Sequence, residues 1–477
     1  MTRRDLFWTA LTPVFAKAQS ARPNILFIMS DDHASHAISA YGSKINQTPN
    51  IDRLGKEGMR FDNCFVTNSI CTPSRGAILT GQYSHKNGVY TLSDSMDVKK
   101  VHLAHHMRDA GYQTAMIGKW HLVTNPQGFD YWNILPGQGA YYDPVFITSE
   151  GKQQHKGYCT DIIADFALDF LKKRDKAKPF FVMCHHKAPH RAWQPAPKYK
   201  DWLKDETIPE PDNLYEDMSK RSQAAQRATL RVGDDNTETD LKVPRPAGLE
   251  GKALRKWAYQ LYIKDYLRCV RSVDDNVGRL LDYLDQEGLS QNTVVVYTSD
   301  QGFFLGDHGW FDKRFMYEET IRMPFLIRYP KMIKNGGVNK DMVLNIDFAP
   351  TFLELAGKKT PPEMQGRSFA TMLAGKKPKD WRTTMYYRYW MHLGGGHTVT
   401  AHYGVRSRTH KLIYYYGQAL GKKGAVDKPT PPEWEMFDLV KDPREMKSVY
   451  GDPAYAKVTA ELKKEMERLR AYYQDTE

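Results

Sequence analysis

The chain has 477 residues, of which 41% are hydrophobic and 12% aromatic, as expected for a globular protein with more than one core. No stretch reaches the roughly 18 apolar residues of a membrane span, so we expect no such span. The formal net charge of +12, from 68 Lys and Arg against 56 Asp and Glu, favours anionic ligands, with a merely solubilising surface as the alternative. Because neither a helix-turn-helix nor a zinc-finger spacing occurs, we expect a partner other than nucleic acid.

The first 20 residues are typical of an export signal. Two arginines, Arg3 and Arg4, precede a short apolar run over 6–15 and a cleavage motif that ends at Ala18. Residues 2–7 also resemble a twin-arginine signal, and a disordered tail is the alternative to both. We therefore expect residues 1–20 to be removed near Ala18 and the mature chain to be periplasmic or extracellular, with the export route left open.

Four short apolar runs each end in polar, titratable residues. Helical patterns over 161–173 and 254–286 alternate with them, which indicates a mainly parallel sheet covered by helices on both faces. In such sheets ligands bind beyond the carboxyl ends of the strands, so the polar clusters should meet at one site. The runs and the residues that follow them are 23–29 with Asp31 and Asp32, 114–117 with Lys119 and His121, 179–184 with His190, and 293–299 with Asp300 and Gln301.

Two further regions differ from these runs in composition and in hydrophobic pattern. Residues 201–252 are highly charged and lack apolar periodicity, so we expect a lid or substrate-binding wall, with a solvated insertion as the alternative. After about residue 375, short Tyr-rich strands precede an amphipathic helical pattern over 455–473. We therefore predict a catalytic α/β domain over 21–375 and a second domain over 376–477, with a small antiparallel sheet and a terminal helix. The strands expected in the second domain are 385–389, 404–408, 411–416 and 435–439.

Cys71 begins the string CTPSRGAILTG, which predicts a helix that starts at the cysteine. Pro73 suits the first turn of a helix, where its missing N–H costs nothing. Residue 71 would then lie at a helix N-terminus, where free N–H groups favour a bound anion. An ordinary thiolate nucleophile with a His partner is the alternative. The five Cys residues include no CxxC pair, so we expect no structural zinc and assign no disulfide.

Hard oxygen ligands follow two of the expected strands. Three carboxylates and an amide oxygen suit Ca²⁺ or Mg²⁺ and do not suit zinc. A divalent ion there would act as a Lewis acid and hold a substrate oxygen beside the nucleophile. A helix cap or turn is the alternative for a lone Asp-Asp pair, but the second strand end and the CTPSR string argue against it. The expected metal ligands are Asp31, Asp32, Asp300 and Gln301.

Three cations belong to the expected site, because fixed cations stabilise the charge that spreads over an anion in transfer. Arg75 lies one helical turn after Cys71, on the same face. Lys119 follows the run over 114–117, and Lys313 lies in the string FDKR. A single lysine of this kind is more often a surface charge. The prediction therefore depends on the three cations being considered together.

Two histidines suit the proton transfers that such a site needs. His121 lies two residues after Lys119, and His190 follows an Ala-Pro pair beyond the run over 179–184. Most of the 16 histidines must be structural or exposed, so the position at a strand end is what selects these two. His186 is the competitor of His190 for the same role.

Four blocks of the chain together resemble the formylglycine-dependent sulfatases of the alkaline phosphatase superfamily. The blocks are PNILFIMSDD, CTPSRGAILTGQ with the following HKNG, GKWH, and YTSDQGFFLGDHGWFDK, and the resemblance spans about 22–470. Their order and spacing make the resemblance specific. Gln301 stands where many relatives carry Asn or His, and its amide oxygen keeps the ligand type. The resemblance implies a large, mainly parallel mixed sheet between helices, as in alkaline phosphatase, and a smaller antiparallel sheet with a terminal helix.

The resemblance also implies a modified residue and a maturation partner. In this family a separate enzyme oxidises the cysteine that matches Cys71 to Cα-formylglycine, whose hydrate attacks sulfate esters. Residue 71 also joins the ligands of the Ca²⁺ ion, for which Mg²⁺ is the alternative. A covalent sulfate ester forms on this residue, and the aldehyde is regenerated when sulfate leaves.

The roles of the other site residues follow from the same resemblance. Arg75 and Lys119 are expected to hold the hydrate and the sulfate oxygens. His190, with Lys313 near the bridging oxygen, is expected to protonate the leaving alcohol. His121 is then expected to take the proton from the second hydroxyl as sulfate leaves.

The expected substrate is a sulfated carbohydrate, since aromatic side chains stack on sugars and Arg binds carboxylates or second sulfates. The strings GQGAYY, CHHKAPHRAWQP and AHYGVR are similar to carbohydrate sulfatases, among them N-acetylglucosamine-6-sulfatases and marine polysaccharide sulfatases. A phosphodiesterase or phosphonate monoester hydrolase that uses the same formylglycine, and a non-catalytic carbohydrate-binding relative, are the alternatives. The residues expected to line the substrate pocket are His308, Arg314, His392, His397 and His402.

Overall fold

A ten-stranded sheet forms the centre of the protein. The computed structural model describes residues 22–477, and the predicted export signal at 1–20 lies outside them. The strands are β1 Asn24–Ser30, β2 Met59–Phe61, β4 Gln113–Lys119, β5 Tyr131–Leu135, β6 Val145–Thr148, β7 Gly151–Gln154, β8 Phe180–His185, β9 Thr293–Ser299, β10 Phe325–Arg328 and β11 Gly337–Asn339. Their order is β11-β2-β10-β9-β1-β8-β4-β5-β6-β7. The central strands from β9 to β5 are parallel, and antiparallel pairs on both sides make the sheet mixed.

The central strands are buried on both faces because alternate side chains enter two different cores. In β1, Ile25, Phe27 and Met29 pack in one core. Leu26 and Ile28 pack in the other. This division follows from the two-residue period of a strand, and it explains why the strands read as continuous apolar runs.

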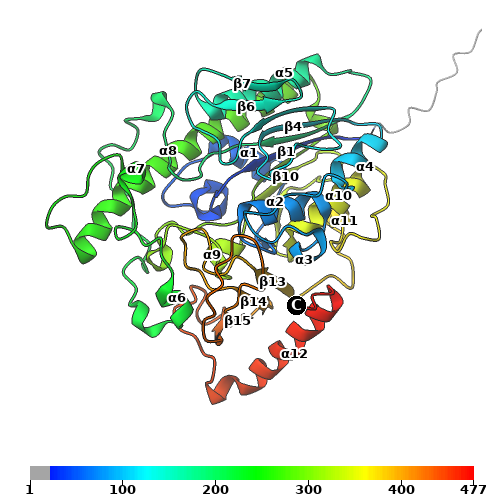
Figure 1. Ribbon diagram of the computed structural model, residues 1–477. Helices are drawn as coiled ribbons and strands as arrows, with labels where there is room; N and C mark the ends of the chain where they lie inside the picture. The colour runs from blue at the N-terminus through cyan, green and yellow to red at the C-terminus, as the bar shows by residue number, and fades with distance from the viewer. Residues whose placement is uncertain (1–21) are drawn as a thin grey trace, which may run out of the picture.

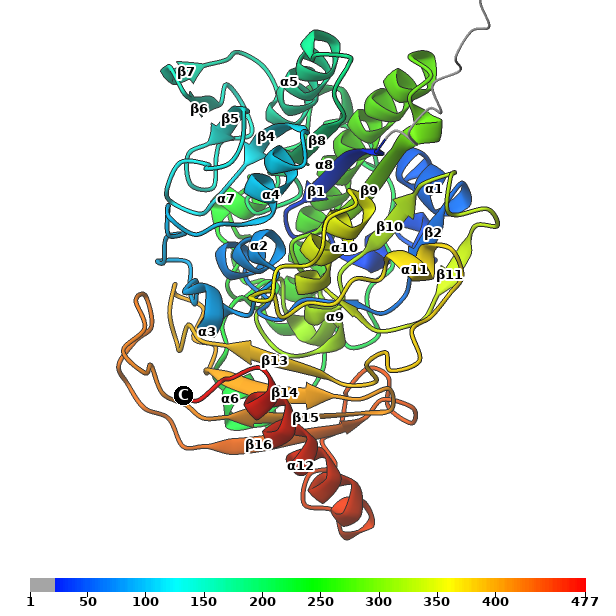
Figure 2. The ribbon, with the colours of Figure 1, turned by 90° about the vertical axis from the view of Figure 1, so that its right-hand side faces the viewer.

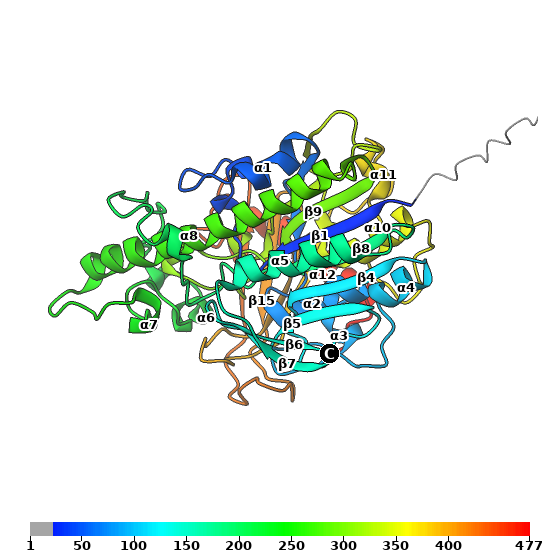
Figure 3. The same cartoon turned by 90° about the horizontal axis from the view of Figure 1, so that it is seen from above.

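Helices cover both faces of the sheet (Figure 1 and Figure 3). On one face, α5 packs against β4, β8 and the long helix α8, which also contacts α1. On the other face, α10 contacts α2 and α4. The helices are α1 Pro49–Lys56, α2 Cys71–Thr80, α3 Ser84–Asn87, α4 Leu103–Asp109, α5 Cys159–Lys173, α6 Gln223–Arg227, α7 Glu238–Leu241, α8 Gly251–Gln286, α9 Glu318–Ile321, α10 Phe348–Leu355, α11 Ala370–Leu373 and α12 Ala456–Tyr472.

A second, smaller sheet lies beside the large layer (Figure 2). Its strands are β13 Met385–Tyr389, β14 His402–Arg406, β15 His410–Tyr415 and β16 Glu433–Asp438, paired antiparallel in chain order. The terminal helix α12 packs against three of them. The predicted fold class is therefore confirmed, while the domain boundary between residues 375 and 376 stays a prediction.

The charged segment 201–252 connects these parts. Before α8 begins at Gly251, it forms two short α-helices, α6 with five residues and α7 with four, and one 3-10 helix over Met218–Lys220. α7 packs against α8 of the large layer. The backbone N–H of Ala224, in α6, donates to Glu433 of the small sheet at 2.6 Å. Among residues 22–477, no helix is long and apolar enough to cross a membrane, and all five cysteines are free and buried.

Candidate active site

The carboxyl ends of four neighbouring parallel strands carry the polar residues singled out in the sequence. β1 lies between β8 and β9, and β4 is the next strand beyond β8. Asp31 follows β1, Asp300 follows β9, Lys119 ends β4, and the loop after β8 carries His190. The structure brings these four side chains, which are far apart in the sequence, to one edge of the sheet.

Asp31, Asp32 and Asp300 form an acidic cluster, in which one oxygen of each residue lies within 4.8 Å of the others. The backbone N–H of Asp32 donates to Asp300 Oδ1 at 3.2 Å, and Gln301 Nε2 donates to Asp32 Oδ1 at 2.5 Å. Gln301 Oε1 is buried and has no hydrogen-bond partner within residues 22–477. Three clustered carboxylates, with the amide group of Gln301 beside them, fit a hard divalent cation such as Ca²⁺.

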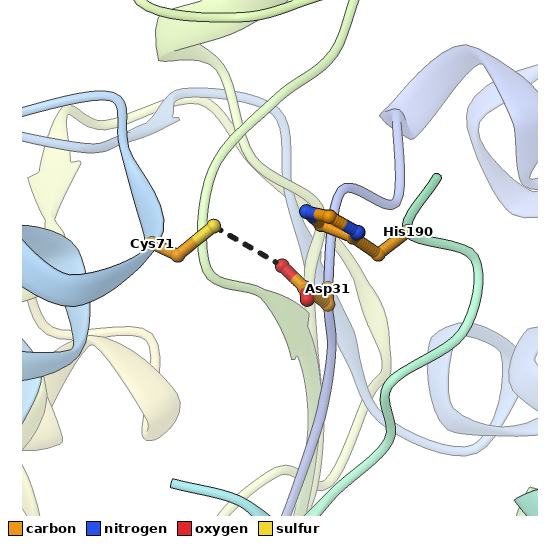
Figure 4. Close-up of side chains that lie close together, drawn as sticks. All are labelled: Asp31, Cys71 and His190. Carbon is orange, nitrogen blue, oxygen red and sulfur yellow. Dashed lines mark hydrogen bonds between the residues drawn. The ribbon is translucent and has the colours of Figure 1, made fainter. Parts of the chain in front are cut away.

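Cys71 is the first residue of α2, as predicted, and its thiol points toward the acidic cluster (Figure 4). Its Sγ lies 3.5 Å from Asp31 Oδ1, and these two residues form a further group with His190. Cys71 is only 1% exposed, and burial raises the pKa of its thiol to about 12. Because the thiolate is the reactive form, the encoded cysteine is a poor nucleophile in this setting.

Three buried cations, all predicted, face the acidic cluster. Burial raises the pKa of Asp32 to about 6, although the charge of the adjacent Lys313 opposes this shift. Burial also disfavours the ionised form of Asp300, but the three cations outweigh burial and hold its pKa below the ordinary value. The ion pairs are Arg75 Nε and Nη2 with Asp300 at 3.0 and 2.9 Å, Lys119 with Asp31, and Lys313 with Asp32 at 2.5 Å.

The two predicted histidines both lie close to the start of α2. His190 Nδ1 donates to the backbone carbonyl of Arg191 at 2.6 Å, so Nε2 is the nitrogen left to exchange a proton. This Nε2 lies 3.7 Å from Asp32 Oδ2. The backbone carbonyl of His121 accepts a hydrogen bond from Thr72, the second residue of α2, at 2.9 Å. The structure therefore ties His121 to the helix that begins with Cys71.

A cavity of about 200 Å³ opens beside Cys71 and contains two of the residues predicted to bind substrate, Arg314 and His397. One carboxylate holds both, since Asp312 Oδ2 lies 3.2 Å from Arg314 Nε and 3.2 Å from His397 Nδ1. Four larger hollows among the described residues, of about 550, 530, 340 and 300 Å³, contain none of the predicted catalytic residues. The cavity is lined by Asp32, Cys71, Leu92, Gln138, His190, Arg191, Leu230, Phe303, Phe311, Asp312, Lys313, Arg314 and His397.

Three of the five residues predicted to line the substrate pocket do not reach the cavity. His308, His392 and His402 are fully buried and do not line this cavity, so their role in substrate binding stays a prediction. Each is held by contacts within the fold. The contacts are Glu216 Oε2 at 2.6 Å from His308 Nδ1, the carbonyl of Lys428 at 3.0 Å from His392 Nε2, and the rings of Tyr387 and Phe315 stacked on His402.

Several cavity residues escaped the sequence-based prediction. Gln138 accepts a hydrogen bond from Lys119 at 2.5 Å, although only the string around it had been noted. Arg191 and Asp312 are the immediate neighbours of His190 and Lys313. Their proximity to predicted catalytic residues is the signal that could have found them.

Comparison with known proteins identifies sulfatases as relatives of this chain. A family model described as sulfatase matches residues 23–358, and one described as N-sulphoglucosamine sulphohydrolase, C-terminal, matches 306–472. The chain is 44% identical to an N-acetylglucosamine-6-O-sulfatase of Bacteroides thetaiotaomicron, over 97% of this chain and 88% of that protein. It is 29% identical to the N-acetylglucosamine-6-sulfatase of Homo sapiens, over 80% of this chain and 69% of that protein.

Solved structures share the fold. One protein, in complex with its substrate D-glucosamine-2-N,6-O-disulfate, matches with a TM-score of 0.91 and 44% identity, over 96% of this chain and 99% of that one. The phosphonate monoester hydrolase of Agrobacterium radiobacter matches with a TM-score of 0.75 and 20% identity, over 95% and 96% of the two chains. At that identity the likeness concerns the fold alone. The resemblance seen in the sequence is thus confirmed, and the chain belongs to the sulfatase family.

Proposed function

We propose that the protein hydrolyses the sulfate ester of a sulfated carbohydrate similar to N-acetylglucosamine 6-sulfate. The observation that carries this proposal is the convergence of Cys71, the acidic cluster and three cations at one edge of the sheet, where Cys71, Asp32 and Lys313 line a small cavity. Such a site can hold an anionic group, polarise it and present a nucleophile to it. The similarity to two N-acetylglucosamine-6-sulfatases supports the choice of sugar. Membership of the sulfatase family supports the sulfate ester as the bond that is hydrolysed.

Ca²⁺ fits the acidic cluster, with Mg²⁺ as the alternative ion. It would be held by oxygen atoms of Asp31, Asp32, Asp300 and Gln301 and by an oxygen on residue 71 after that residue is oxidised. When bound, such an ion supplies a Lewis acid beside the sulfate group. The unpaired Gln301 Oε1 supports this ligand set, because a buried acceptor without a partner is unfavourable.

Formylglycine at position 71, made from Cys71 by a maturation enzyme, completes the proposal. It supplies a hydrated aldehyde whose hydroxyl group serves as the nucleophile. The encoded thiol is poorly suited to that role, since burial raises its pKa to about 12. The position of Cys71 at the first turn of α2, beside the acidic cluster, supports its use as the reacting residue.

The surrounding residues bind the sulfate and move protons. Arg75 and Lys119 bind the sulfate oxygens, and their burial strengthens each electrostatic contact because water is excluded. His190 protonates the leaving alcohol from Nε2, and this step requires the doubly protonated ring, because Nδ1–H is committed to a backbone carbonyl. Burial lowers the pKa of His190, so the negative charge of the bound sulfate ester has to favour the protonated form. Lys313 stabilises the same bridging oxygen, and His121 takes a proton from the hydroxyl on residue 71.

We further propose that the chain is exported and that the export signal within its first 20 residues is removed near Ala18. The composition of that segment supports this proposal. N-terminal sequencing of protein recovered outside the cytoplasm should begin just after Ala18. Recovery of a full-length chain only from the cytoplasm would contradict export.

The test of the function is release of inorganic sulfate from N-acetylglucosamine 6-sulfate. The protein is produced together with a formylglycine-generating enzyme, and a Cys71→Ala variant is the control. We expect sulfate release by the wild type and none by the variant. An aryl phosphodiester and a phosphonate monoester serve as competing substrates, and a strong preference for either would overturn the proposal.

A further inference from the structure

The charged segment 201–252 holds the loop that carries His190. Asp240, in α7, accepts two hydrogen bonds from Arg191, from Nε at 2.6 Å and from Nη2 at 2.5 Å. Asp240 is itself fixed, because the backbone N–H and the hydroxyl of Thr237 both donate to its Oδ2 at 2.8 Å. It is only 1% exposed. The residue that follows His190 is therefore bound to a rigid, buried carboxylate.

Lys242 fastens the same loop at a second place. Its Nζ donates to the backbone carbonyls of Ala192 and Trp193 at 2.9 and 2.8 Å. It also lies 3.0 Å from Asp265 in α8, so the contact is anchored to the large layer. Residues 237–242 thus form a clamp on the loop from His190 to Trp193.

Arg191 lines the cavity while it is paired with Asp240. Its guanidinium group lies over the ring of Phe311, with 5.1 Å from Cζ to the ring centroid. Nη1 has no hydrogen-bond partner within residues 22–477, and the side chain is 29% exposed. A guanidinium with one edge bound to a carboxylate still offers donors on its other edge. Arg191 therefore lines the cavity with an N–H group that no described residue binds.

Charges in the cavity wall are balanced. Three permanent cations line the cavity, and each has a carboxylate partner among the described residues. One of them, Lys313, belongs to the catalytic site. The pairs are Arg191 with Asp240, Lys313 with Asp32, and Arg314 with Asp312. Outside the sulfate-binding centre, the cavity thus offers hydrogen-bond donors without an excess positive charge.

We propose that Arg191 binds a neutral polar substituent of the sugar through Nη1. Asp240 cancels the charge of Arg191 and so selects a sugar that carries no second anionic group. This inference rests on the proposed function, because it concerns the sugar bound at the same site. It assigns the segment 201–252 a role as a specificity element, through the clamp formed by residues 237–242.

The experiment compares two substrates that share the 6-O-sulfate. One is N-acetylglucosamine 6-sulfate, and the other is D-glucosamine-2-N,6-O-disulfate, which carries a second anionic group. The wild type should have the higher kcat/KM for the monosulfate. Asp240→Asn removes one negative charge and should shift the ratio of the two kcat/KM values roughly tenfold in favour of the disulfate. A tenfold shift corresponds to the Coulomb interaction between two unit charges about 6 Å apart at an effective dielectric constant of about 40.

Two further variants separate charge from structure. Arg191→Lys keeps the charge pair with Asp240 but loses the second edge of the guanidinium, so it should raise KM for both sugars and leave their ratio unchanged. Asp234→Asn is the matched control, because Asp234 is exposed and pairs with Arg255 at 3.1 Å in the same segment outside the clamp. It should behave as the wild type on both sugars.

The outcomes distinguish this inference from the function on which it rests. Preference of the wild type for the disulfate would overturn the inference, even if Asp240→Asn failed to fold. So would an unchanged ratio in a folded Asp240→Asn protein, as judged by its melting temperature. Absence of sulfate release from both sugars by matured wild type would overturn the proposed function, and the inference with it.

Discussion

Replacement of Arg75 by Met tests the charge balance of the site. Arg75 is 2% exposed and donates two hydrogen bonds to Asp300 Oδ2, at 3.0 and 2.9 Å. A third bond joins its Nη1 to the backbone carbonyl of Lys119. Methionine has a similar length but no charge, so the variant leaves a buried carboxylate without its closest partner.

The magnitude follows from the surroundings of Asp300. Removal of one partner from a buried ion pair costs about 3–5 kcal/mol, because the other charge stays buried. Lys119 and Lys313 also stabilise the ionised form of Asp300. We therefore expect the free energy of unfolding to fall by about 3 kcal/mol, the lower end of that range. Activity should be abolished, since Arg75 is a proposed donor to the sulfate group.

The assay is urea unfolding, followed by fluorescence in the presence of a chelator so that no metal ion compensates the acidic cluster. Arg279→Met is the matched control, because Arg279 pairs with Asp165 at 2.5 Å on the surface, with side chains 42% and 56% exposed. It should cost below about 1 kcal/mol. If Arg75→Met were as stable as this control, the reasoning about a buried charge pair would be refuted.

The remaining predictions concern residue 71, the metal ion and one glycine. Cys71→Ser, made in a host that converts only cysteine, should fold but show no turnover, and mass spectrometry of the wild-type peptide should show an aldehyde in place of the thiol; unmodified Cys71 in an active preparation would contradict the mechanism. A Ca²⁺ chelator should lower both activity and melting temperature, because three buried carboxylates then repel one another, and indifference to the chelator would count against the metal site. Gly118→Ala should give mostly insoluble protein, since its Cβ would lie 2.0 Å from the carbonyl oxygen of His185 at a φ of +93°. Gly137→Ala has open space around its Cβ at a φ of +52°, so it should remain soluble; equal solubility of the two variants would contradict the steric argument.

The strand ends were predictable because two physical signals coincide there. A strand buried on both faces has to be apolar throughout, and Asp31 and Asp300 break two such runs abruptly. The parallel arrangement then requires these breaks to meet at one edge of the sheet. The helix at Cys71 was predictable from Pro73 in its first turn.

The substrate pocket was harder to predict because it depends on contacts between distant segments. His308, His392 and His402 have the residue type of a binding site, but each satisfies a partner inside the fold. Residue type alone does not show which way a side chain points. The role of Arg191 depends on Asp240, 49 residues later, and nothing local to either residue indicates the pair.

The burial of Cys71 sets the order of events in the making of the protein. The thiol is 1% exposed and opens only onto a cavity of about 200 Å³, which has no room for another protein's active site. An enzyme that oxidises Cys71 must therefore meet this segment while the chain is still unfolded. If Cys71 is oxidised as proposed, folding then closes the site around the modified residue, and a chain that folds first should stay inactive. The yield of active protein should accordingly depend on the rate of oxidation relative to the rate of folding. Slower folding at low temperature should therefore raise the fraction of chains that are oxidised.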